Sequence, residues 1–349
     1  MNPSVDVLLT GASGFVGSAV LRALLREGLQ VRALVRPKSR YQDLASRGAQ
    51  FVEGDLREKS SLQSACIGCR NLIHVAADYR LALRDGAGVH ETNIGGTRNL
   101  MEAATRAAIE RIVYTSSVAT LEPRHDGAPA DEADRLPLQR AIGAYKQSKV
   151  VAEQLVLDMI RQEGLPAVIV NPSTPVGPRD IRPTPTGKII VAAAAGKIPA
   201  YVDTGLNVVH VDDVASGHLS ALRRGRVGER YILGGENIAF SQLLAEIAGS
   251  VGRKCPKFRI PWYAAVPAAI AGEARSYLTG DEPLATWAGV RLARHRMFFT
   301  SAKAEQELGY RARPHREALI DAVAWFSDHG YLGAPAAEPK LGMFRLPFS

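Results

Sequence analysis

The sequence predicts an α/β fold, in which a doubly wound parallel sheet carries helices on both faces and is followed by a smaller C-terminal lobe. Strand and helix patterns alternate through the first half of the chain, and such alternation favours a parallel sheet. A glycine-rich turn joins the first expected strand to the first expected helix. Beyond Pro172, proline, glycine and threonine become frequent, which marks the start of a second region.

The expected strands of the first half are short apolar runs with polar or glycine-rich ends. They cover residues 5–9, 30–35, 51–53, 71–75, 111–115 and 167–171. The expected helices have apolar residues at helical spacing and cover residues 18–27, 89–107 and 144–161. The carboxyl ends of parallel strands meet at one edge of the sheet, so we expect a ligand to bind there.

The second half is predicted in less detail. Residues 172–205 are expected to form loops around a pocket, and residues 302–329 to contain further helices. Between them we expect strands at 208–211 and 231–233, helices at 213–223 and 240–251, and an apolar, alanine-rich segment at 261–279. We favour packing of this last segment as an ordinary helix of the lobe. The alternative is that it docks on a membrane together with the tail from Ala334.

The glycine-rich turn is the most specific local signal. Residues 10–18 read Thr-Gly-Ala-Ser-Gly-Phe-Val-Gly-Ser. Gly11 permits a tight turn, Gly14 lets the backbone approach a pyrophosphate, and Gly17 lets the helix pack closely on the sheet. The helix N-terminus then offers N–H groups and a positive dipole end to an anion. The turn therefore predicts a dinucleotide site contacted by Gly11, Ser13, Gly14, Phe15, Val16 and Gly17.

These patterns divide the chain into a Rossmann-type dinucleotide-binding domain and a substrate lobe. The first covers residues 1–172 with parts of 205–235, and the second covers 173–204 and 236–332. Residues 333–349 are expected to be a disordered tail.

Composition limits the classes of partner and compartment. The net charge of +8 suits an anionic partner, either a phosphorylated cofactor or an acidic membrane surface, although it also fits a generally solvated basic surface. No basic stripe interleaved with aromatic residues indicates nucleic acid. Three cysteines are too few for a disulfide framework, and we interpret Cys66 and Cys69 as packing residues, with no metal site. We expect a cytoplasmic protein, or one peripheral to the inner face of the membrane, because neither a signal peptide nor a long apolar span is evident.

A second motif provides acid–base chemistry. Tyr145 and Lys149 lie four residues apart at the start of an expected helix, so they share one face. An ammonium group beside a phenol lowers the pKa of the phenol, which then exchanges a proton with a substrate oxygen more readily. Ser117 ends the preceding strand region at the ligand edge of the sheet, where its hydroxyl can hold the same oxygen.

With these residues in place, the chain resembles an extended short-chain dehydrogenase/reductase, the superfamily of nucleotide-sugar epimerases and dihydroflavonol reductases. The resemblance covers residues 5–332 and includes the motifs Gly-Asp-Leu at 54–56, His-Val-Ala-Ala at 74–77 and His-Val-Asp-Asp-Val at 210–214. Longer segments at 74–80, 171–180 and 201–210 resemble the hopanoid-associated sugar epimerase family.

The resemblance implies roles for individual residues. Ser117, Tyr145 and Lys149 match the catalytic residues, and Lys149 also holds the nicotinamide ribose. The implied cofactor contacts outside the glycine turn are Asp55, Leu56, Ala76, Ala77, Asn93, Tyr145, Lys149, Pro172, Ser173 and Thr174; Arg36 is a further expected cofactor contact, on the chemical grounds given below. The implied substrate contacts are Asp78, Tyr79, Ser117, Asn171 and Tyr201. For Asn93 a purely structural role as a backbone cap is an equal alternative to a proton relay, and Asp212 and Asp213 match residues that anchor the substrate lobe.

Two departures from the nucleotide-sugar epimerase pattern affect the predicted ligands. Val35 stands where many NAD-dependent relatives have an acid, and Arg36 follows it, which favours NADP(H) over NAD(H). The region where those enzymes commonly place an arginine that holds the sugar-nucleotide diphosphate is occupied by Leu206, Asn207, Val208 and Val209, so the usual clamp is incomplete. A contribution from elsewhere in the chain, by Arg291, Arg294 or Arg296, is the alternative.

The leading prediction is an NADP(H)-dependent oxidoreductase or epimerase acting on a small-molecule or lipid-linked sugar or polyol substrate, in hopanoid lipid biosynthesis. There are two alternatives. One is a ketone or aldehyde reductase of the dihydroflavonol-reductase type acting on a non-sugar substrate, and the other is a non-catalytic regulator that senses a dinucleotide. NAD(H) as cofactor, peripheral membrane contact and a homodimer stay open.

Overall fold

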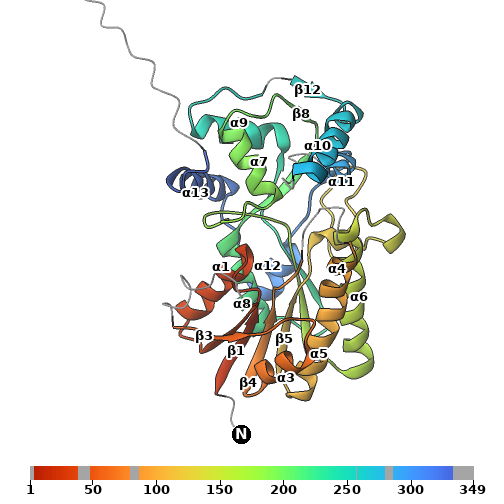
Figure 1. The fold of residues 1–349 in the computed structure, drawn as a ribbon, viewed down its shortest axis with the longest axis vertical. Helices are drawn as coiled ribbons and strands as arrows, with labels where there is room; N and C mark the ends of the chain where they lie inside the picture. Colours follow the sequence, from red (N-terminus) through yellow and green to blue (C-terminus); the bar gives the residue numbers. More distant parts are fainter. Residues whose placement is uncertain (1–3, 38–47, 79–85, 257, 280–285, 333–349) are drawn as a thin grey trace, which may run out of the picture.

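The computed structural model describes residues 4–37, 48–78, 86–256, 258–279 and 286–332. Within these residues, seven parallel strands form the main sheet in the order β10-β6-β5-β4-β1-β2-β3 (Figure 1). The sheet winds in opposite directions on the two sides of β1 and β4. In open α/β sheets, ligands bind at this point, beyond the carboxyl ends of the strands. The predicted α/β fold with a doubly wound parallel sheet is confirmed.

Apart from the edge strand β3, the main sheet is largely buried on both faces, which explains why most of its strands are nearly continuous apolar runs. Its strands are β1 (Val5–Thr10), β2 (Val31–Val35), β3 (Gln50–Glu53), β4 (Cys69–His74), β5 (Arg111–Thr115), β6 (Ala167–Pro172) and β10 (Arg230–Leu233).

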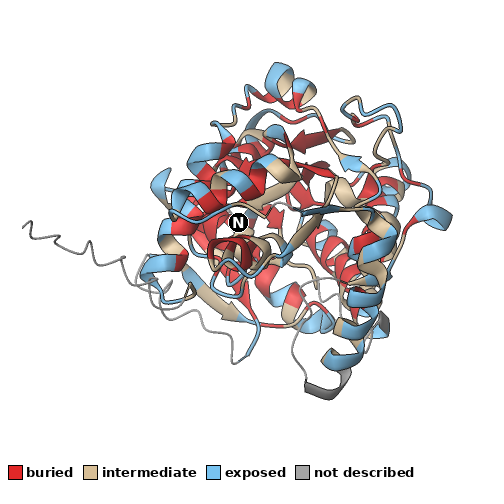
Figure 2. Ribbon diagram, turned by 90° about the horizontal axis from the view of Figure 1, so that it is seen from above, coloured by how far each residue is buried: buried red, intermediate tan, exposed pale blue. Residues whose placement is uncertain are grey.

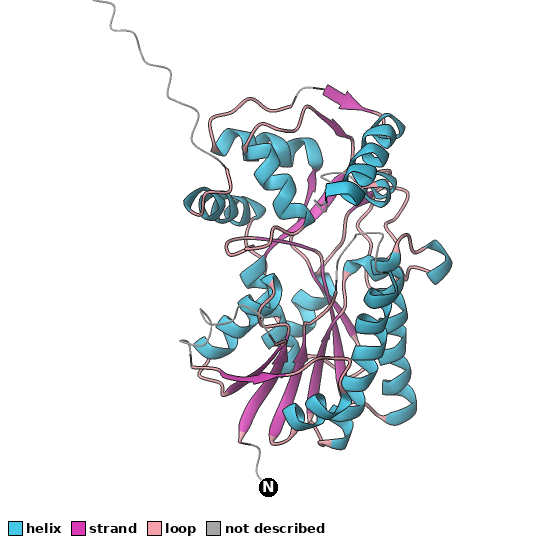
Figure 3. Cartoon of the chain, in the orientation of Figure 1, coloured by secondary structure: helices cyan, strands magenta, loops and turns pink. Residues whose placement is uncertain are grey.

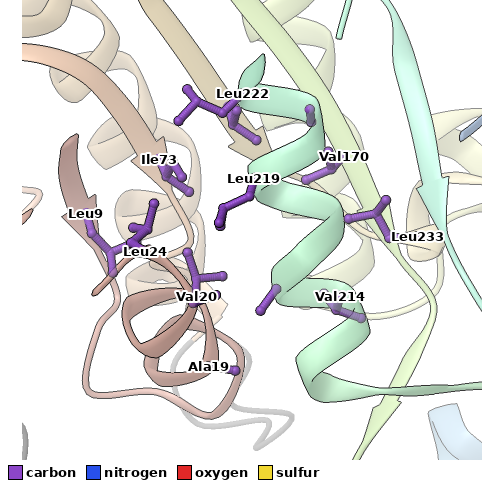
Figure 4. Close-up of a cluster of buried hydrophobic side chains, with 14 of the residues drawn as sticks. Leu9, Ala19, Val20, Leu24, Ile73, Val170, Val214, Leu219, Leu222 and Leu233 are labelled. Carbon is purple, nitrogen blue, oxygen red and sulfur yellow. The ribbon is translucent and has the colours of Figure 1, made fainter. Parts of the chain in front are cut away.

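Helices cover the two faces of this sheet. One face carries α1 (Phe15–Arg26) and α8 (Val211–Arg224), and the other carries α3 (Lys59–Cys66), α5 (Gly96–Arg106) and α6 (Ala144–Glu163). Figure 4 shows side chains of α1 and α8 packed against Leu9, Ile73 and Val170 of the sheet. Burying one Leu or Val side chain contributes about 1.5–3 kcal/mol, so this layer holds the phosphate-binding turn firmly in place.

The second lobe is built around β9 (Gly205–His210). Strand β11 (Glu236–Ala239) pairs with β9 in antiparallel fashion, whereas β7 (Thr174–Val176) and β13 (Arg296–Met297) pair with it in parallel. The helices packed into the core of this lobe are α7 (Pro185–Ala194), α9 (Phe240–Ser250) and α13 (His315–Asp328). In Figure 2 the buried residues, in red, lie mostly toward the middle of the molecule, and the exposed residues, in pale blue, lie mostly at its periphery.

The remaining elements of the lobe connect or cap these layers (Figure 3). They are β8 (Ala200–Val202), β12 (Phe258–Ile260), α10 (Val266–Thr279) and α11 (Trp287–Leu292). Helix α12 (Ala302–Leu308) instead packs beside α8, with Ala304 and Leu308 in the core of the main sheet. Asp213 in α8 accepts hydrogen bonds from the Arg313 guanidinium at 2.8 and 2.9 Å, which ties α8 to the segment leading into α13. Among the described helices, none has the length and hydropathy needed to cross a bilayer.

The structure corrects several expectations. Residues 172–205 are not a set of loops, because β7, α7 and β8 lie there; the Thr184 hydroxyl accepts a hydrogen bond from Gly187 N and Pro185 occupies the first turn of α7. The strand expected at 208–211 ends one residue earlier, since His210 caps α8 by accepting from Asp212 N at 3.0 Å.

The helix expected at 89–107 is also interrupted. It consists of α4 (Gly86–His90), a π-helical turn η2 (Glu91–Gly95) and α5. Helix α3 was not predicted. The segment expected at 261–279 contains α10, yet among its side chains described at 261–276 only Ala269 is buried, unlike the ordinary packed helix that we favoured.

Candidate active site

The glycine turn lies where β1 meets α1, and its shape requires glycine, which has no side chain, at two positions. Gly11 has φ +80°, and a Cβ atom there would lie 2.7 Å from Ala76 N. A Cβ at Gly17 would lie 2.0 Å from the Gly11 carbonyl oxygen. Both contacts are too short for any other residue type. The turn therefore brings the N-terminus of α1 directly against the ends of β1 and β4, as a dinucleotide pyrophosphate requires.

The other predicted residues of the turn surround this N-terminus. Gly14 is the N-cap residue of α1, directly before Phe15, and its N–H donates to the Gly11 carbonyl at 2.9 Å. Ser13 and Gly14 are exposed, and Phe15 and Val16 are partly exposed. These positions are accessible to a ligand.

A buried histidine joins the strands beneath the turn. His74 Nδ1 lies 2.7 Å from the Thr10 hydroxyl, and its Nε2 lies 3.1 Å from the Thr97 hydroxyl. The Thr10 hydroxyl in turn accepts from Ala76 N at 3.2 Å. Burial lowers the pKa of His74 to about 3, and the Lys149 ammonium acts in the same direction. His74 is therefore neutral, and it holds the Ala76–Ala77 segment beside the glycine turn.

The ends of β2 and β3 bring three charged groups together. Arg57 holds Asp55 through hydrogen bonds of 2.9 Å from Nε and 2.8 Å from Nη2. These bonds lower the pKa of Asp55 to about 2, with a smaller contribution from the charge of Arg36. Arg36 is exposed directly after β2. Leu56 is buried against Gly96, where a Cβ atom would lie 2.7 Å from the Leu56 Cβ.

The acid–base residues lie at the start of α6, beside the carboxyl end of β5. Tyr145 is in the first turn of α6 and is partly exposed, and Lys149 follows one turn later. Lys149 Nζ donates to the Thr115 carbonyl at 2.8 Å. Burial lowers the pKa of Lys149 to about 8, against the opposing effect of Glu153. The lysine is thus fixed to the strand that leads into Ser117.

Ser117 is partly exposed, and its hydroxyl oxygen accepts a hydrogen bond from Ala119 N at 3.1 Å, which caps the short helix η3 (Val118–Thr120). The structure therefore places the three predicted catalytic residues on two neighbouring elements at the ligand edge of the sheet.

Asn93 connects two segments of the site from a buried position in η2. Its Oδ1 accepts from Asp78 N at 2.7 Å, and its Nδ2 donates to the Asp78 carbonyl at 2.8 Å and to the Ser148 hydroxyl at 2.9 Å. The Ser148 hydroxyl donates to the Tyr145 carbonyl at 2.7 Å. These bonds favour the structural alternative for Asn93, which positions the Tyr145 turn. Direct contact of Asn93 with a cofactor stays a prediction.

Sequence reasoning missed a buried polar network behind Ser117. Glu153 Oε1 lies 3.2 Å from Arg230 Nη1, and its Oε2 accepts from the Thr120 hydroxyl at 2.9 Å. Asn171 Nδ2 donates to Glu153 Oε2 at 2.8 Å and to the Ser117 carbonyl at 3.1 Å. The available signal was spacing, because Glu153 follows Lys149 by four residues. Asn171 is fully buried here and supports the Ser117 backbone; its contact with substrate stays a prediction.

The remaining predicted residues lie on the lobe side of the site. Ser173 and Thr174 are partly exposed after β6, Pro172 is buried at the end of that strand, and Tyr201 is partly exposed in β8. Tyr79 lies outside the described residues, as does the tail 333–349.

The region expected to lack an arginine clamp is strand β9. Leu206 is buried there, and the Asn207 amide bonds to the Gly235 carbonyl and to Asn237 within the lobe. Cys66 is buried at the end of α3 and Cys69 at the start of β4, both as packing residues, and burial raises the pKa of the Cys66 thiol to about 12.

Comparisons with known proteins agree with this geometry. The model of the NAD dependent epimerase/dehydratase family matches residues 7–234. The chain is 45% identical to the putative dihydroflavonol 4-reductase of Synechocystis, over 93% of this chain and 95% of that protein. It is 32% identical to sterol demethylase protein B of Methylococcus capsulatus, over 94% and 100% of the two chains. The crystal structure of gox2253 is 50% identical, with a TM-score of 0.85, over 94% of this chain and 100% of that one. The chain therefore belongs to the NAD dependent epimerase/dehydratase family and is an NAD(P)-dependent enzyme of the extended short-chain dehydrogenase/reductase type.

Proposed function

We propose that this enzyme transfers a hydride between NADP(H) and a carbon that bears an alcohol or carbonyl group on a sugar-like or polyol-bearing, lipid-linked substrate. The observation that carries the proposal is the position of Lys149, buried beside β5 and one turn after Tyr145, with Ser117 at the end of the same strand region. This arrangement supplies an acid–base pair and a hydroxyl at one edge of the sheet.

The glycine turn fits a dinucleotide, since only glycine leaves room at positions 11 and 17 for the close approach of α1. When bound, the nicotinamide supplies or accepts the hydride. In our proposal Tyr145 gives a proton to the substrate oxygen during reduction and takes it back during oxidation. The Lys149 ammonium stabilises the phenolate that results, and the Ser117 hydroxyl holds the same oxygen.

Preference for NADP(H) rests on the end of β2. Arg36 is exposed there, Val35 contributes no carboxylate, and the nearby Asp55 carboxylate is already held by Arg57. A 2′-phosphate at this position would meet guanidinium groups, with which it forms charge-assisted hydrogen bonds.

The lipid-linked character of the substrate is supported by the name of one relative, a sterol demethylase protein, and by the absence of an arginine at Leu206. A net reduction is supported by the name of another relative, a dihydroflavonol 4-reductase. The role in hopanoid biosynthesis and the return of the hydride to the same substrate, as in an epimerase, rest on the sequence resemblance alone. We also propose that the enzyme contacts a membrane peripherally and assembles as a homodimer.

The proposal is tested by identifying the nucleotide that copurifies with the protein and following its absorbance at the nicotinamide band with candidate carbonyl and alcohol compounds. A stoichiometric redox change with one class of compound is the expected result. Cofactor binding without a redox change on any compound would favour the non-catalytic regulator instead.

A further inference from the structure

One end of the lobe exposes an unusual number of large apolar side chains. We call this surface the lobe tip; it comprises the described residues 258–279 and 286–296, which form β12, the short helix η5 (Trp262–Ala265), α10 and α11. The described residues include nine exposed large hydrophobic side chains, and four of them lie on the tip. These four are Phe258, Tyr263, Ile270 and Trp287, which are 73%, 64%, 55% and 38% exposed.

The helix α10 itself is apolar but hardly buried. In its first three turns Pro267, Ala268, Ile270, Ala271 and Ala274 are exposed. By contrast, α13 buries Ala318, Leu319, Ala322, Val323 and Phe326 against the protein and exposes Ile320 as its one large apolar side chain. Contiguous exposed apolar surface of this kind marks a contact site.

Positive charge is concentrated on the same segment. Residues 253–296 contain eight lysines and arginines but three aspartates and glutamates, so this stretch carries +5 of the net charge of +8. The cations that the structure describes there are all exposed, and they are Arg253, Lys254, Arg259, Arg275, Arg291, Arg294 and Arg296. Exposed cations thus lie on the same segment as the exposed apolar side chains; two of them, Arg259 and Arg296, pair with Asp203 at 2.8 and 3.8 Å.

Three of these cations lie against aromatic rings, and for two of them, Arg291 and Arg294, the ring belongs to the tip. The Arg294 guanidinium carbon is 4.7 Å from the Trp262 ring centre, and that of Arg291 is 5.9 Å from the Trp287 ring centre. Trp287 N also donates to the Glu273 carboxylate at 2.9 Å, which joins α11 to α10. Aromatic rings beside arginines suit the boundary between acyl chains and phosphate headgroups, where rings insert and guanidinium groups bind phosphate.

The tip is connected to the active-site side of the molecule. The ring of His295, just after α11, lies 5.2 Å from the ring of His125, in the segment that follows Ser117 and η3. Figure 1 shows α10 and α11 on the lobe above the ends of α4 and α6. A surface to which the tip is bound would therefore lie on the side of the molecule where the lobe meets the segment that follows Ser117.

We propose that the lobe tip binds the surface of a bilayer that contains anionic phospholipids. The proposal rests on the proposed lipid-linked substrate, since membrane contact brings the enzyme to a substrate that lies partly in the bilayer. Small and aromatic apolar side chains supply the inserted area, and the cations attract the acidic headgroups.

The test is co-sedimentation of the full-length protein with vesicles of phosphatidylcholine, with and without phosphatidylglycerol. We expect binding to the acidic vesicles at low salt and little binding to phosphatidylcholine alone. The variant Phe258→Ala/Tyr263→Ala/Ile270→Ala should bind the acidic vesicles about tenfold more weakly. Arg291→Ser/Arg294→Ser should weaken binding by about fivefold for each charge removed.

Matched controls remove exposed residues elsewhere. Ile67→Ala/Val227→Ala/Ile320→Ala and Arg106→Ser/Arg161→Ser should bind like the unmodified protein. The proposal would be overturned if the tip and control variants bound vesicles equally well, or if no form of the protein bound vesicles. Loss of binding on removal of the tail alone would also overturn it. So would a tip variant that changes the oligomeric state in size-exclusion chromatography while still binding vesicles.

A second measurement separates this proposal from the proposed function. Turnover of a water-soluble carbonyl compound is measured with the same tip variant. Turnover retained with vesicle binding lost supports the lobe tip as the membrane contact. If no form of the protein has turnover but vesicle binding depends on the tip residues, the lobe tip is supported as the membrane contact and the proposed reaction is refuted.

Discussion

Glu153 and Arg230 form a buried ion pair, 3.2 Å between Oε1 and Nη1, directly behind the loop that carries Ser117. Their side chains are 6% and 7% exposed. The pair is one turn from Lys149 on α6 and also reaches β10 at the edge of the main sheet. A single carboxylate thus acts on both halves of the candidate catalytic group, on Lys149 through its charge and on Ser117 through Asn171.

The first prediction concerns this carboxylate. Glu153 opposes the effect of burial on the pKa of Lys149, which is about 8. The change Glu153→Gln removes that charge, so the pKa of Lys149 should fall further. Lys149 should then lose its proton at a lower pH than in the unmodified protein. The alkaline limb of the kcat/KM profile, along which activity falls as the lysine deprotonates, should therefore move toward neutrality.

The control for this prediction is Glu163→Gln, an exposed residue at the end of the same helix. Breaking a buried pair costs about 3–5 kcal/mol of folding stability, so the Glu153 variant should also unfold at lower denaturant concentration. A second variant, Glu153→Gln/Arg230→Gln, removes both charges of the pair, so it should regain part of that folding stability. Its alkaline limb should stay at the shifted pH, because the carboxylate that acts on Lys149 is still absent. An unshifted pH profile in a folded Glu153→Gln protein would refute the electrostatic role.

The second prediction concerns the proton donor. Tyr145→Phe removes one hydroxyl from a partly exposed side chain, so the protein should fold and bind cofactor normally. Its turnover should fall by roughly 100- to 10,000-fold, the usual contribution of a general acid. Turnover is measured beside cofactor titration, with Tyr331→Phe as the matched control, because Tyr331 is a partly exposed tyrosine that follows α13 and is not among the predicted site residues. Near-normal activity of the Tyr145 variant would mean that another group transfers the proton.

The third prediction concerns the cofactor. We expect NADPH to bind more tightly than NADH, because the exposed Arg36 can hold the 2′-phosphate. Charge-assisted bonds of this kind contribute about 1.5–3 kcal/mol, or roughly 10- to 100-fold in affinity. Arg36→Ala should remove most of this preference in a fluorescence titration, while Arg70→Ala, on the opposite end of the sheet, should retain it. Equal affinities in the unmodified enzyme would contradict the idea.

A feature of this structure can be predicted from the sequence when residues close together in the chain determine it. The glycine turn and the pair Tyr145 and Lys149 are defined by spacing within a few residues, and the structure has them on the expected strand, turn and helices. The misreading of 172–205 came from composition, because Thr184 and Pro185 cap and start a helix as well as they start a loop.

Other features depend on contacts distant in sequence. The π-helical turn around Asn93 is stabilised by bonds to Asp78 and Ser148, which lie 15 and 55 residues away. The partner of Glu153 lies 77 residues away. The exposure of α10 could not be predicted either, because its alanine-rich sequence fits a buried helix equally well. In each case tertiary packing decides between alternatives that local propensity leaves open.

The last prediction concerns the substrate. Nucleotide-sugar enzymes of this type commonly hold the diphosphate with an arginine at the position of Leu206, and here that side chain is buried in β9 beside Asn207, whose amide is bonded within the lobe. Without that charge-assisted contact, worth about 1.5–3 kcal/mol, a nucleotide-diphosphate sugar should bind only weakly. Calorimetric titration with a panel of such sugars should give dissociation constants near the millimolar range, about −4 kcal/mol. Titration of the same samples with NADPH shows that the protein is folded and its glycine turn intact. Low-micromolar binding of any of these sugars would restore a nucleotide-sugar epimerase, and would require the diphosphate to be held by groups other than those of β9.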